Sequence, residues 1–242
     1  MEIPLPVALA VLGAALLHAG WNALLKAGAD KQLDAIGLAA GSGAVALIVA
    51  PFLGAPAPAS WPWIAASAVV HIAYFWLLAG AYRWGDLSFS YPIMRGGGPL
   101  IVTVAGVMVF GEVLPWTQTF GVLLIGAGIL AFATHSARDA VAQRKSLAFA
   151  LGNACVIAAY TLIDAKGARV SGAPVAYAMW FFITNGAIMF ALGCLQRGAA
   201  APRHFLRRWR LTFVAGSCAV LAYAIALWAM TRAPVALVAV LR

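Results

Sequence analysis

The chain consists of apolar runs of about twenty residues that follow one another almost from end to end. A hydrocarbon core ~30 Å thick is crossed by about 20 apolar residues in a helix, and continuous runs favour helices over the alternating strands of a barrel. Mean hydropathy is +0.93 over 242 residues, of which only 10% are charged. Neither a soluble globule nor one anchor helix accounts for this pattern. The sequence therefore predicts an all-α fold, a polytopic membrane helix bundle.

Eight spans and a stub are expected, because turn residues or polar stretches separate the apolar runs. The main breaks are the Gly/Pro/Ala/Ser segment 54–60, the polar stretch 135–146 and the basic stretch 196–210, which is expected to be a loop. The expected spans are Val7–Leu25, Ala35–Leu53, Trp63–Tyr82, Leu87–Phe110, Trp116–Thr134, Leu147–Ile163, Pro174–Leu195 and Leu211–Met230, followed by an unfinished run from Val235.

An internal repeat connects the two halves of the sequence, as in many transporters. The offset between matched segments drifts as loop lengths would make it drift, while their order is kept. Matched positions are Gly13, Trp21, Asn22 and Gly28 with Gly152, Tyr160, Thr161 and Gly167 (offset 139), Gly43-Ala44 with Gly186-Ala187 (offset 143), and Ile72-Ala73-Tyr74, Leu78 and Arg83 with Leu221-Ala222-Tyr223, Leu227 and Arg232 (offset 149).

The repeat predicts a first unit over residues 1–135 and a second, incomplete one over residues 146–242. If Arg95 corresponds to Arg242, the first unit continues for 39 residues beyond that point. The intact protein is then expected to have about 280 residues and ten spans, five in each half. An odd number of spans in each half makes the halves enter the membrane in opposite senses.

The net charge of +9 is explained by membrane orientation and does not indicate a nucleic-acid partner. Loops after the first, third, fifth and seventh spans hold eleven Lys and Arg residues, against three on the other side. This bias predicts cytoplasmic odd-numbered loops and an external N-terminus. Cys155, Cys194 and Cys218 are isolated, so their spacing indicates no metal, disulfide or redox site.

The first span carries His18, Trp21 and Asn22 on one helix face, because residues three and four apart are neighbours. Polar groups inside a membrane are costly, so this stripe needs a reason. It either lines a central cavity or bonds to neighbouring helices. Tyr74 and Tyr223 lie about twelve residues into their helices, which favours a lining role over an interfacial one, although a tyrosine bonded to a carbonyl is equally compatible.

The fourth span contains Arg95 followed by three glycines, between Pro92 and Pro99. Two prolines and three glycines weaken the helical hydrogen-bond ladder, and the sequence predicts an interrupted helix. Arg95 could bind a substrate carboxylate or phosphate, or be neutralised by carbonyls that the interruption frees. Glu112, at a span boundary, is expected to be solvated or to cap the next helix.

No nucleophile elbow, zinc-protease motif, phosphate-binding loop or pair of intramembrane carboxylates is found in the sequence. We therefore expect no enzyme, no catalytic residues, no metal and no cofactor.

Four segments in order resemble the EamA branch of the drug/metabolite transporter superfamily over the whole chain. They are Leu-His-Ala-Gly-Trp-Asn-Ala-Leu-Leu-Lys in the first span, Ala-Tyr-Arg-Trp-Gly-Asp-Leu-Ser-Phe-Ser-Tyr-Pro-Ile-Met-Arg-Gly into the fourth, Phe-Gly-Glu-Val-Leu-Pro-Trp at its end, and Ala-Pro-Val-Ala-Leu-Val-Ala-Val-Leu-Arg at the C-terminus. The resemblance implies a ten-helix carrier of two inverted halves, of which the last two helices are missing here.

The resemblance also implies alternating access without ATP and a central cavity for a small metabolite, in a multi-pass protein of a bacterial inner membrane. Export is the expected direction, and a homodimer is left open. Alternatives are a membrane enzyme or lipid-linked intermediate flippase, and a non-transporting assembly subunit. The substrate-binding candidates are His18, Trp21, Asn22, Tyr74, Tyr91, Arg95, Tyr160 and Tyr223.

Overall fold

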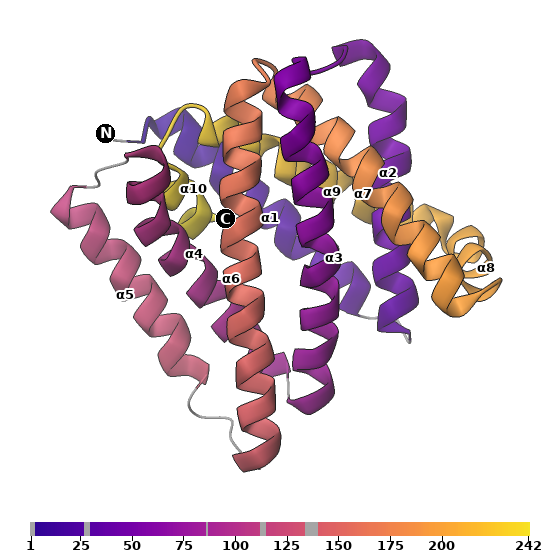
Figure 1. Ribbon diagram of the computed structural model, residues 1–242, viewed down its shortest axis with the longest axis horizontal. Helices are drawn as coiled ribbons and strands as arrows, with labels where there is room; N and C mark the ends of the chain where they lie inside the picture. Colours follow the sequence, from indigo (N-terminus) through magenta and orange to yellow (C-terminus); the bar gives the residue numbers. More distant parts are fainter. Residues whose placement is uncertain (1–2, 27–29, 86, 112–114, 134–139) are drawn as a thin grey trace. The chain divides into compact units, whose positions relative to one another are not determined.

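The computed structural model describes residues 3–26, 30–85, 87–111, 115–133 and 140–242, and these are helical almost throughout (Figure 1). Within these ranges no strand is present. In the described part of the chain, seven helices are long and apolar enough to cross a membrane. Large side chains such as Leu16 and Met108 are mostly exposed, as contact with lipid requires. The expected all-α polytopic membrane helix bundle is confirmed.

Each expected span coincides with a helix. The elements are α1 (Leu5–Lys26), α2 (Lys31–Leu53), the 3-10 turn η1 (Pro58–Ser60), α3 (Trp61–Trp84), α4 (Leu87–Phe110), α5 (Trp116–Ala133), α6 (Ala140–Val170), α7 (Pro174–Arg197), α8 (Ala200–Arg207), α9 (Trp209–Met230) and α10 (Val235–Leu241). Seven of the eight expected spans meet the criteria for crossing; α5 has 18 residues, and its apolar stretch in the described part is Thr119–Gly128.

Three expectations about these helices are wrong. The sequence predicts an end of the sixth span at Ile163, but α6 continues to Val170, because residues 164–170 contain no proline and helix formation stops only before Gly172, where φ is +64°. The basic stretch 196–210 contains α8, an alanine- and arginine-rich helix. Ala201 of α8 is buried in an apolar cluster with Leu33 and Ile36 of α2.

The third correction concerns α4, which is one continuous helix despite Pro92 and Pro99. Its glycines serve close packing. A Cβ atom on Gly97 would lie 3.0 Å from Cβ of Ala154, and one on Gly98 would lie 2.8 Å from Cγ2 of Ile157. The backbone of α4 therefore approaches α6 closely, and packing against α6 holds the helix together where the sequence predicted a break.

The described residues fall into two compact units that share α3 and α6. Unit 1 consists mainly of Val69–Ile163 and Ala233–Val240, and unit 2 of Pro4–Ala68, Asp164–Arg232 and Leu241–Arg242. The core of unit 1 is formed by α3, α4 and α6, with Ile93, Met94 and Ile157 at its centre. Ser90 and Ser146 add a buried hydroxyl pair at 2.7 Å.

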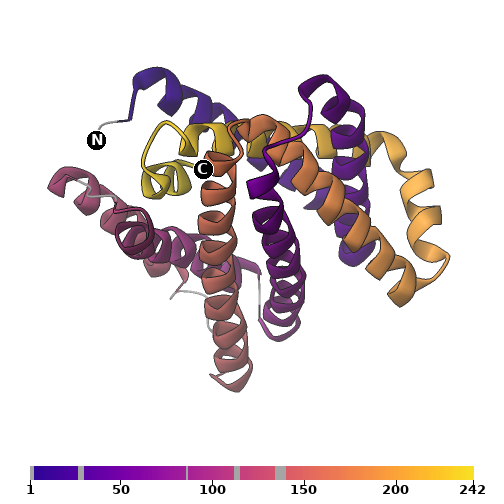
Figure 2. The ribbon, with the colours of Figure 1, turned by 45° about the horizontal axis from the view of Figure 1, so that its top comes forward.

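In unit 2, α2 and α7 lie side by side and run antiparallel (Figures 1 and 2). Contacts along the pair show this direction, because residues later in α2 contact residues earlier in α7. Gln196 accepts a hydrogen bond from Gln32, Gly193 packs against Ile36, Gly186 meets Gly43, and Trp180 donates to the carbonyl of Gly54 just after α2.

Helices α2 and α7 meet through glycine. A Cβ atom on Gly43 would lie 3.3 Å from Cα of Gly186 and 3.2 Å from the carbonyl oxygen of Phe182. A Cβ atom on Gly186 would lie 2.7 Å from the carbonyl oxygen of Ala39. The two backbones are thus in direct contact, as small-residue interfaces between membrane helices allow.

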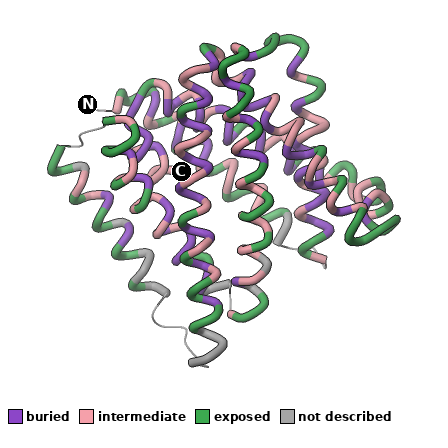
Figure 3. Tube along the Cα trace, in the orientation of Figure 1, coloured by how far each residue is buried: buried purple, intermediate pink, exposed green. Residues whose placement is uncertain are grey.

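Helix α9 also packs on α2 but runs parallel to it. Thr212 contacts Gly37 and Gly41, and Gly216, one turn later on α9, contacts the backbone at Gly41 and Ser42. The buried stretches of α2, α7 and α9 are purple in Figure 3. Glycine therefore sets the spacing between the helices at the centre of unit 2.

We predict that Gly186→Ala destabilises the protein by roughly 1–3 kcal/mol, because the new methyl group would overlap the backbone of Ala39. Gly13→Ala is the matched control, since a Cβ atom there meets nothing within 4 Å. Alanine should leave stability at that position unchanged or raise it by up to about 1 kcal/mol. Thermal unfolding in detergent measures both; equal melting temperatures would contradict this account of α2 and α7.

Candidate functional site

A carboxylate, Asp164 of α6, is buried inside unit 2 with hydroxyl groups from three other helices. Ser67 of α3 donates a hydrogen bond to Oδ2 at 2.9 Å, and Tyr177 of α7 donates to Oδ1 at 2.8 Å. Tyr223 of α9 donates to Oδ2. We call these four residues the carboxylate cluster. Asp164, Ser67 and Tyr177 are each 0% exposed.

The local sequence makes room for this cluster. Gly167 follows Asp164 by three residues on α6, and a Cβ atom there would lie 2.5 Å from the Tyr177 hydroxyl. Glycine thus allows the tyrosine ring to lie against α6 with its hydroxyl on the carboxylate. Tyr223 is fixed by the rings of Phe181 and Phe182, whose centroids lie 5.5 and 5.6 Å away.

The charge balance of the cluster is unusual for a membrane interior. A charge at the centre of a membrane helix costs roughly 2.5–3.5 kcal/mol, and such residues normally pair with one another. Among the described residues, the hydrogen-bond partners of Asp164 are hydroxyls. The guanidinium of Arg242 lies over the ring of Tyr223, 5.0 Å from its centroid, and attracts the carboxylate electrostatically.

The carboxylate cluster lies inside one end of unit 2. Asp164 precedes the end of α6 by six residues, and Ser67 follows the start of α3 by six, so each is about 9 Å along its helix. The backbone amide of Ala57 donates to the carbonyl of Ser171, which joins the start of α3 to the turn between α6 and α7. We call this end of unit 2 the pocket end.

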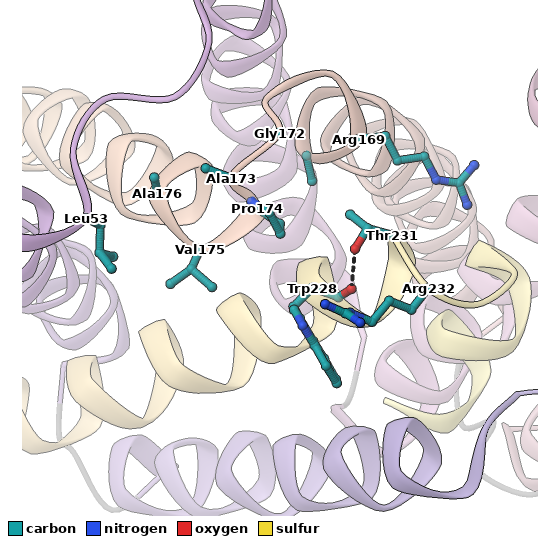
Figure 4. A pocket seen from close by; sticks show the side chains of 11 residues that line it. Leu53, Arg169, Gly172, Ala173, Pro174, Val175, Ala176, Trp228, Thr231 and Arg232 are labelled. Carbon is teal, nitrogen blue, oxygen red and sulfur yellow. Dashed lines mark hydrogen bonds between the residues drawn. The ribbon is translucent and has the colours of Figure 1, made fainter.

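A pocket of about 400 Å³ opens at the pocket end (Figure 4). Ala168, one helical turn beyond Asp164, and Ala176, the neighbour of Tyr177, both line it. It is also lined by Arg169, which donates to the carbonyl of Met230 at 3.0 Å, and by Arg232, which lies 4.8 Å from the Trp228 ring centroid. The pocket therefore reaches α6 and α7 within one turn of the carboxylate cluster.

Unit 1 holds a separate group of candidate residues. The ring of Tyr160 on α6 lies 4.3 Å from His71 and 6.0 Å from Tyr74, both on α3. On α4, Nε of Arg95 donates to the Tyr91 hydroxyl at 3.3 Å, and the guanidinium interacts electrostatically with Tyr74 and Tyr160. We call these residues the arginine–tyrosine group. Four candidates, Tyr74, Tyr91, Arg95 and Tyr160, are thus brought together.

The predicted stripe on α1 is present, and its members contact one another. The His18 and Trp21 rings are 4.8 Å apart, and the Asn22 side-chain amide donates to the His18 carbonyl at 2.8 Å. Within the described part of the chain, the Trp21 indole nitrogen is buried without a hydrogen-bond partner. All three belong to unit 2. Glu112 lies outside the described residues.

Three members of the carboxylate cluster, Asp164, Ser67 and Tyr177, were missed from sequence, and only Tyr223 was named. The signal for Asp164 was the absence of proline between Ile163 and Gly172. Extending the span by two turns would have placed a carboxylate inside the membrane. Ser67 and Tyr177 carry no comparable signal, because a serine among alanines and a tyrosine near a helix start are ordinary in membrane proteins.

Two aspartates that pair with cationic side chains lie at the opposite end of unit 2, which we call the basic end. Asp34 of α2 is buried, and its Oδ1 lies 2.5 Å from Nη1 of Arg208 and 2.9 Å from Nε2 of His204. Asp30 caps α2 by accepting from the Leu33 amide at 3.0 Å and pairs with Arg197 at 2.5 Å. These contacts tie the start of α2 to α7 and α8.

Comparison of the chain with protein-family models, with curated proteins and with solved structures finds no match in any of the three. The site is therefore interpreted from its own chemistry. It combines a buried carboxylate that accepts hydrogen bonds from three hydroxyls with a pocket one helical turn away.

The ion pair at the basic end predicts a pH dependence. The pKa of Asp30 is below its ordinary value, chiefly because the Leu33 amide donates to the carboxylate, with a further hydrogen bond and charge from Arg197; slight burial opposes them. A lowered folded pKa contributes stability above the unfolded value of ~3.9, and that stability is lost as pH falls through the folded pKa.

Asp30→Asn should therefore lower the melting temperature at pH 7, and the difference from the parent should shrink progressively as the pH falls below the unfolded value of ~3.9. About a third of each side chain in the pair is exposed, so the loss should be at most ~1 kcal/mol. Asp30→Ala, which also removes the cap, should cost about 1 kcal/mol more. A difference in melting temperature between the parent and the Asp30→Asn protein that does not change with pH in detergent would contradict the assignment.

Proposed function

We propose that the chain is a secondary-active carrier of a small metabolite, working by alternating access and related to the EamA branch of the drug/metabolite transporters. The basic end faces the cytoplasm of a bacterial inner membrane, because Lys31, Arg197, Arg207 and Arg208 gather there. The pocket end then faces outward. Export is the direction we assign.

The observation that carries the proposal is the register of α2 against α7. The sequence repeat pairs Gly43 with Gly186 at an offset of 143, and the same two glycines meet where the helices cross. The contact is reciprocal, because Gly43 faces the carbonyl of Phe182 while Gly186 faces that of Ala39, and these two residues are also separated by 143.

Reciprocal contacts between equivalent positions are what a two-fold axis produces, since each copy presents the same surface to the other. The repeat-matched helices also run antiparallel, as α2 and α7 do. Both properties support two halves related by an axis in the membrane plane, the architecture in which carriers rock one repeat against the other.

A second correspondence lies in the charged residues. Arg95 interacts electrostatically with Tyr74 in unit 1, and Arg242 lies over Tyr223 in unit 2. The repeat matches Tyr74 with Tyr223 and Arg95 with Arg242. Each half thus brings an arginine to a tyrosine within the membrane. Guanidinium groups bind carboxylate and phosphate groups bidentately, so each of these arginines is a candidate to hold an anionic substrate group.

A two-stage experiment tests the proposal. Purified protein is first screened by thermal shift against amino acids, nucleosides, phosphonates and quaternary amines, because a ligand at 100 Kd stabilises by about 2.7 kcal/mol. Compounds that stabilise are then offered as labelled solutes to proteoliposomes under exchange conditions. Counterflow of a stabilising compound is expected. Conversion of the solute, or binding without any exchange, would instead support an enzyme or a non-transporting assembly subunit.

We further predict that Arg95→Ala abolishes stabilisation by anionic compounds while leaving the melting temperature of the free protein within about 3 °C. Arg83→Ala is the matched control, because Arg83 lies in the same unit but is exposed at the end of α3, over Trp84. The control should retain every thermal shift. Unchanged shifts in the Arg95→Ala protein would reject a substrate role for this arginine.

A further inference from the structure

We propose that Asp164 is a proton-binding site of the carrier, which takes up and releases its proton through the pocket at the pocket end of unit 2. The proposal rests on the proposed function for its role in transport. As a statement about proton binding, it rests on the carboxylate cluster alone.

The cluster can satisfy either protonation state. A hydroxyl group donates one hydrogen bond and also accepts. The ionised carboxylate accepts from Ser67, Tyr177 and Tyr223, as the contacts show. When a proton adds to Oδ2, the new O–H group donates to the hydroxyl oxygen of Ser67 or Tyr223, which turns its own hydrogen elsewhere. Both oxygens of Asp164 keep a partner in either state, so neither state carries the penalty of an unmade hydrogen bond on the carboxyl group.

Different parts of the surroundings of Asp164 favour opposite protonation states of its carboxyl group. Burial in a membrane span favours the neutral acid, because the ionised form loses its hydration. The positive charge of Arg242 beside Tyr223 favours the ionised form, as do the three hydroxyl donors. The other elements packed on the carboxylate contribute Ser67 from α3, Tyr177 from α7 and Tyr223 from α9. On α6 itself, Lys166 is exposed and Arg169 is engaged with the Met230 carbonyl.

The types of partner distinguish Asp164 from Asp34, the second buried carboxylate among the described residues. Asp34 is held directly by Arg208 and His204, so its charge is neutralised in place. Asp164 has hydroxyls where Asp34 has cations. Both the ionised and the neutral state of Asp164 are hydrogen-bonded, and Arg242 acts on the carboxylate across a tyrosine ring. Asp164 can therefore change charge without unfolding its surroundings.

The pocket provides the path by which the proton enters and leaves. It is lined by Ala168, one helical turn beyond Asp164 on α6, and by Ala176, the chain neighbour of Tyr177 on α7. Figure 4 shows Ala176 on the pocket wall. In the release step, the O–H bond of the acid breaks, its electron pair stays on the carboxylate oxygen, and the proton passes to a water molecule that enters from the pocket when the helices around the cluster move apart. Uptake is the reverse. Alternating access would expose the carboxylate to one side at a time and so couple proton movement to that of the solute.

The test uses dicyclohexylcarbodiimide, an apolar reagent that enters membranes. A protonated carboxyl group transfers its proton to a carbodiimide nitrogen while its oxygen bonds to the central carbon, and the adduct rearranges to a stable acylurea with no atoms lost. The reaction requires the acid proton, so labelling reports protonation. The purified 242-residue protein is treated between pH 5 and pH 9, and the labelled peptides are quantified by mass spectrometry.

Labelling of Asp164 should rise at least tenfold from pH 9 to pH 5, while Asp34, its matched internal control, stays unlabelled. Tyr223→Phe should move the midpoint up by about one pH unit, because it removes one hydrogen bond to the charged form. Labelling of Asp164 that is absent or independent of pH, or equal labelling of both carboxylates, would overturn the proposal.

The result is separable from that of the transport assay, since no substrate is needed and the unsubstituted protein gives the decisive measurement. If labelling follows pH but no solute exchanges, the proton site stands and the carrier assignment fails. If a solute exchanges but labelling does not follow pH, the carrier stands and Asp164 is a structural tie between four helices. For an exchanging solute, Asp164→Asn should keep counterflow and lose accumulation driven by a pH gradient.

Discussion

The cost of burying polar groups away from water shapes every part of this chain. Inside a bilayer, each backbone amide and carbonyl must bond within the protein, which restricts the spanning segments to helices and favours their continuation. Helix α6 illustrates the rule, because it continues past Asp164 and Lys166 to Val170. Once the helix continues, the Asp164 side chain must be satisfied inside the protein too. The three hydroxyls on α3, α7 and α9 are the consequence.

Helix association in this setting cannot rely on the hydrophobic effect, since lipid is as apolar as leucine. Unit 2 uses close backbone approach instead, with Gly43 against Gly186 and Gly41 against Thr212 and Gly216. Helices α3 and α6 also approach closely, because Ser67 of α3, with one carbon between backbone and hydroxyl, reaches Asp164 of α6. In the carboxylate cluster itself, Gly167 of α6 leaves the space in which the Tyr177 ring lies against that helix.

Sequence reasoning located the helices well because hydropathy and helix length are set by the bilayer, whatever the helices pack against. It failed where contacts between helices determine the local secondary structure. Pro92 and Pro99 predicted a break in α4, but contact of Gly97 and Gly98 with α6 keeps the helix whole. The basic segment that contains α8 was expected to be a loop, yet burial of Ala201 and the ion pairs of Asp34 order it.

The same limit applies to the candidate residues. Tyr74, Tyr160 and Arg95 could be named because aromatic and charged residues are conspicuous in an apolar run, and they do lie together in unit 1. The carboxylate cluster could not be assembled from sequence. Its members come from helices that are far apart in the chain, and only three-dimensional packing identifies which serine and which tyrosines face Asp164.

Tyr223 shows why the chain uses tyrosine between opposite charges. Its hydroxyl donates to Asp164, and the face of its ring carries the Arg242 guanidinium. A direct ion pair between the two would recover much of the desolvation cost, but removing or neutralising either partner would then leave a strongly destabilised buried charge. With its hydroxyl on one charge and its ring face against the other, Tyr223 leaves each charge only partly compensated. This partial compensation is the property on which the proposed proton site depends, because a carboxylate in a closed ion pair would lose its partner's compensation on taking up a proton.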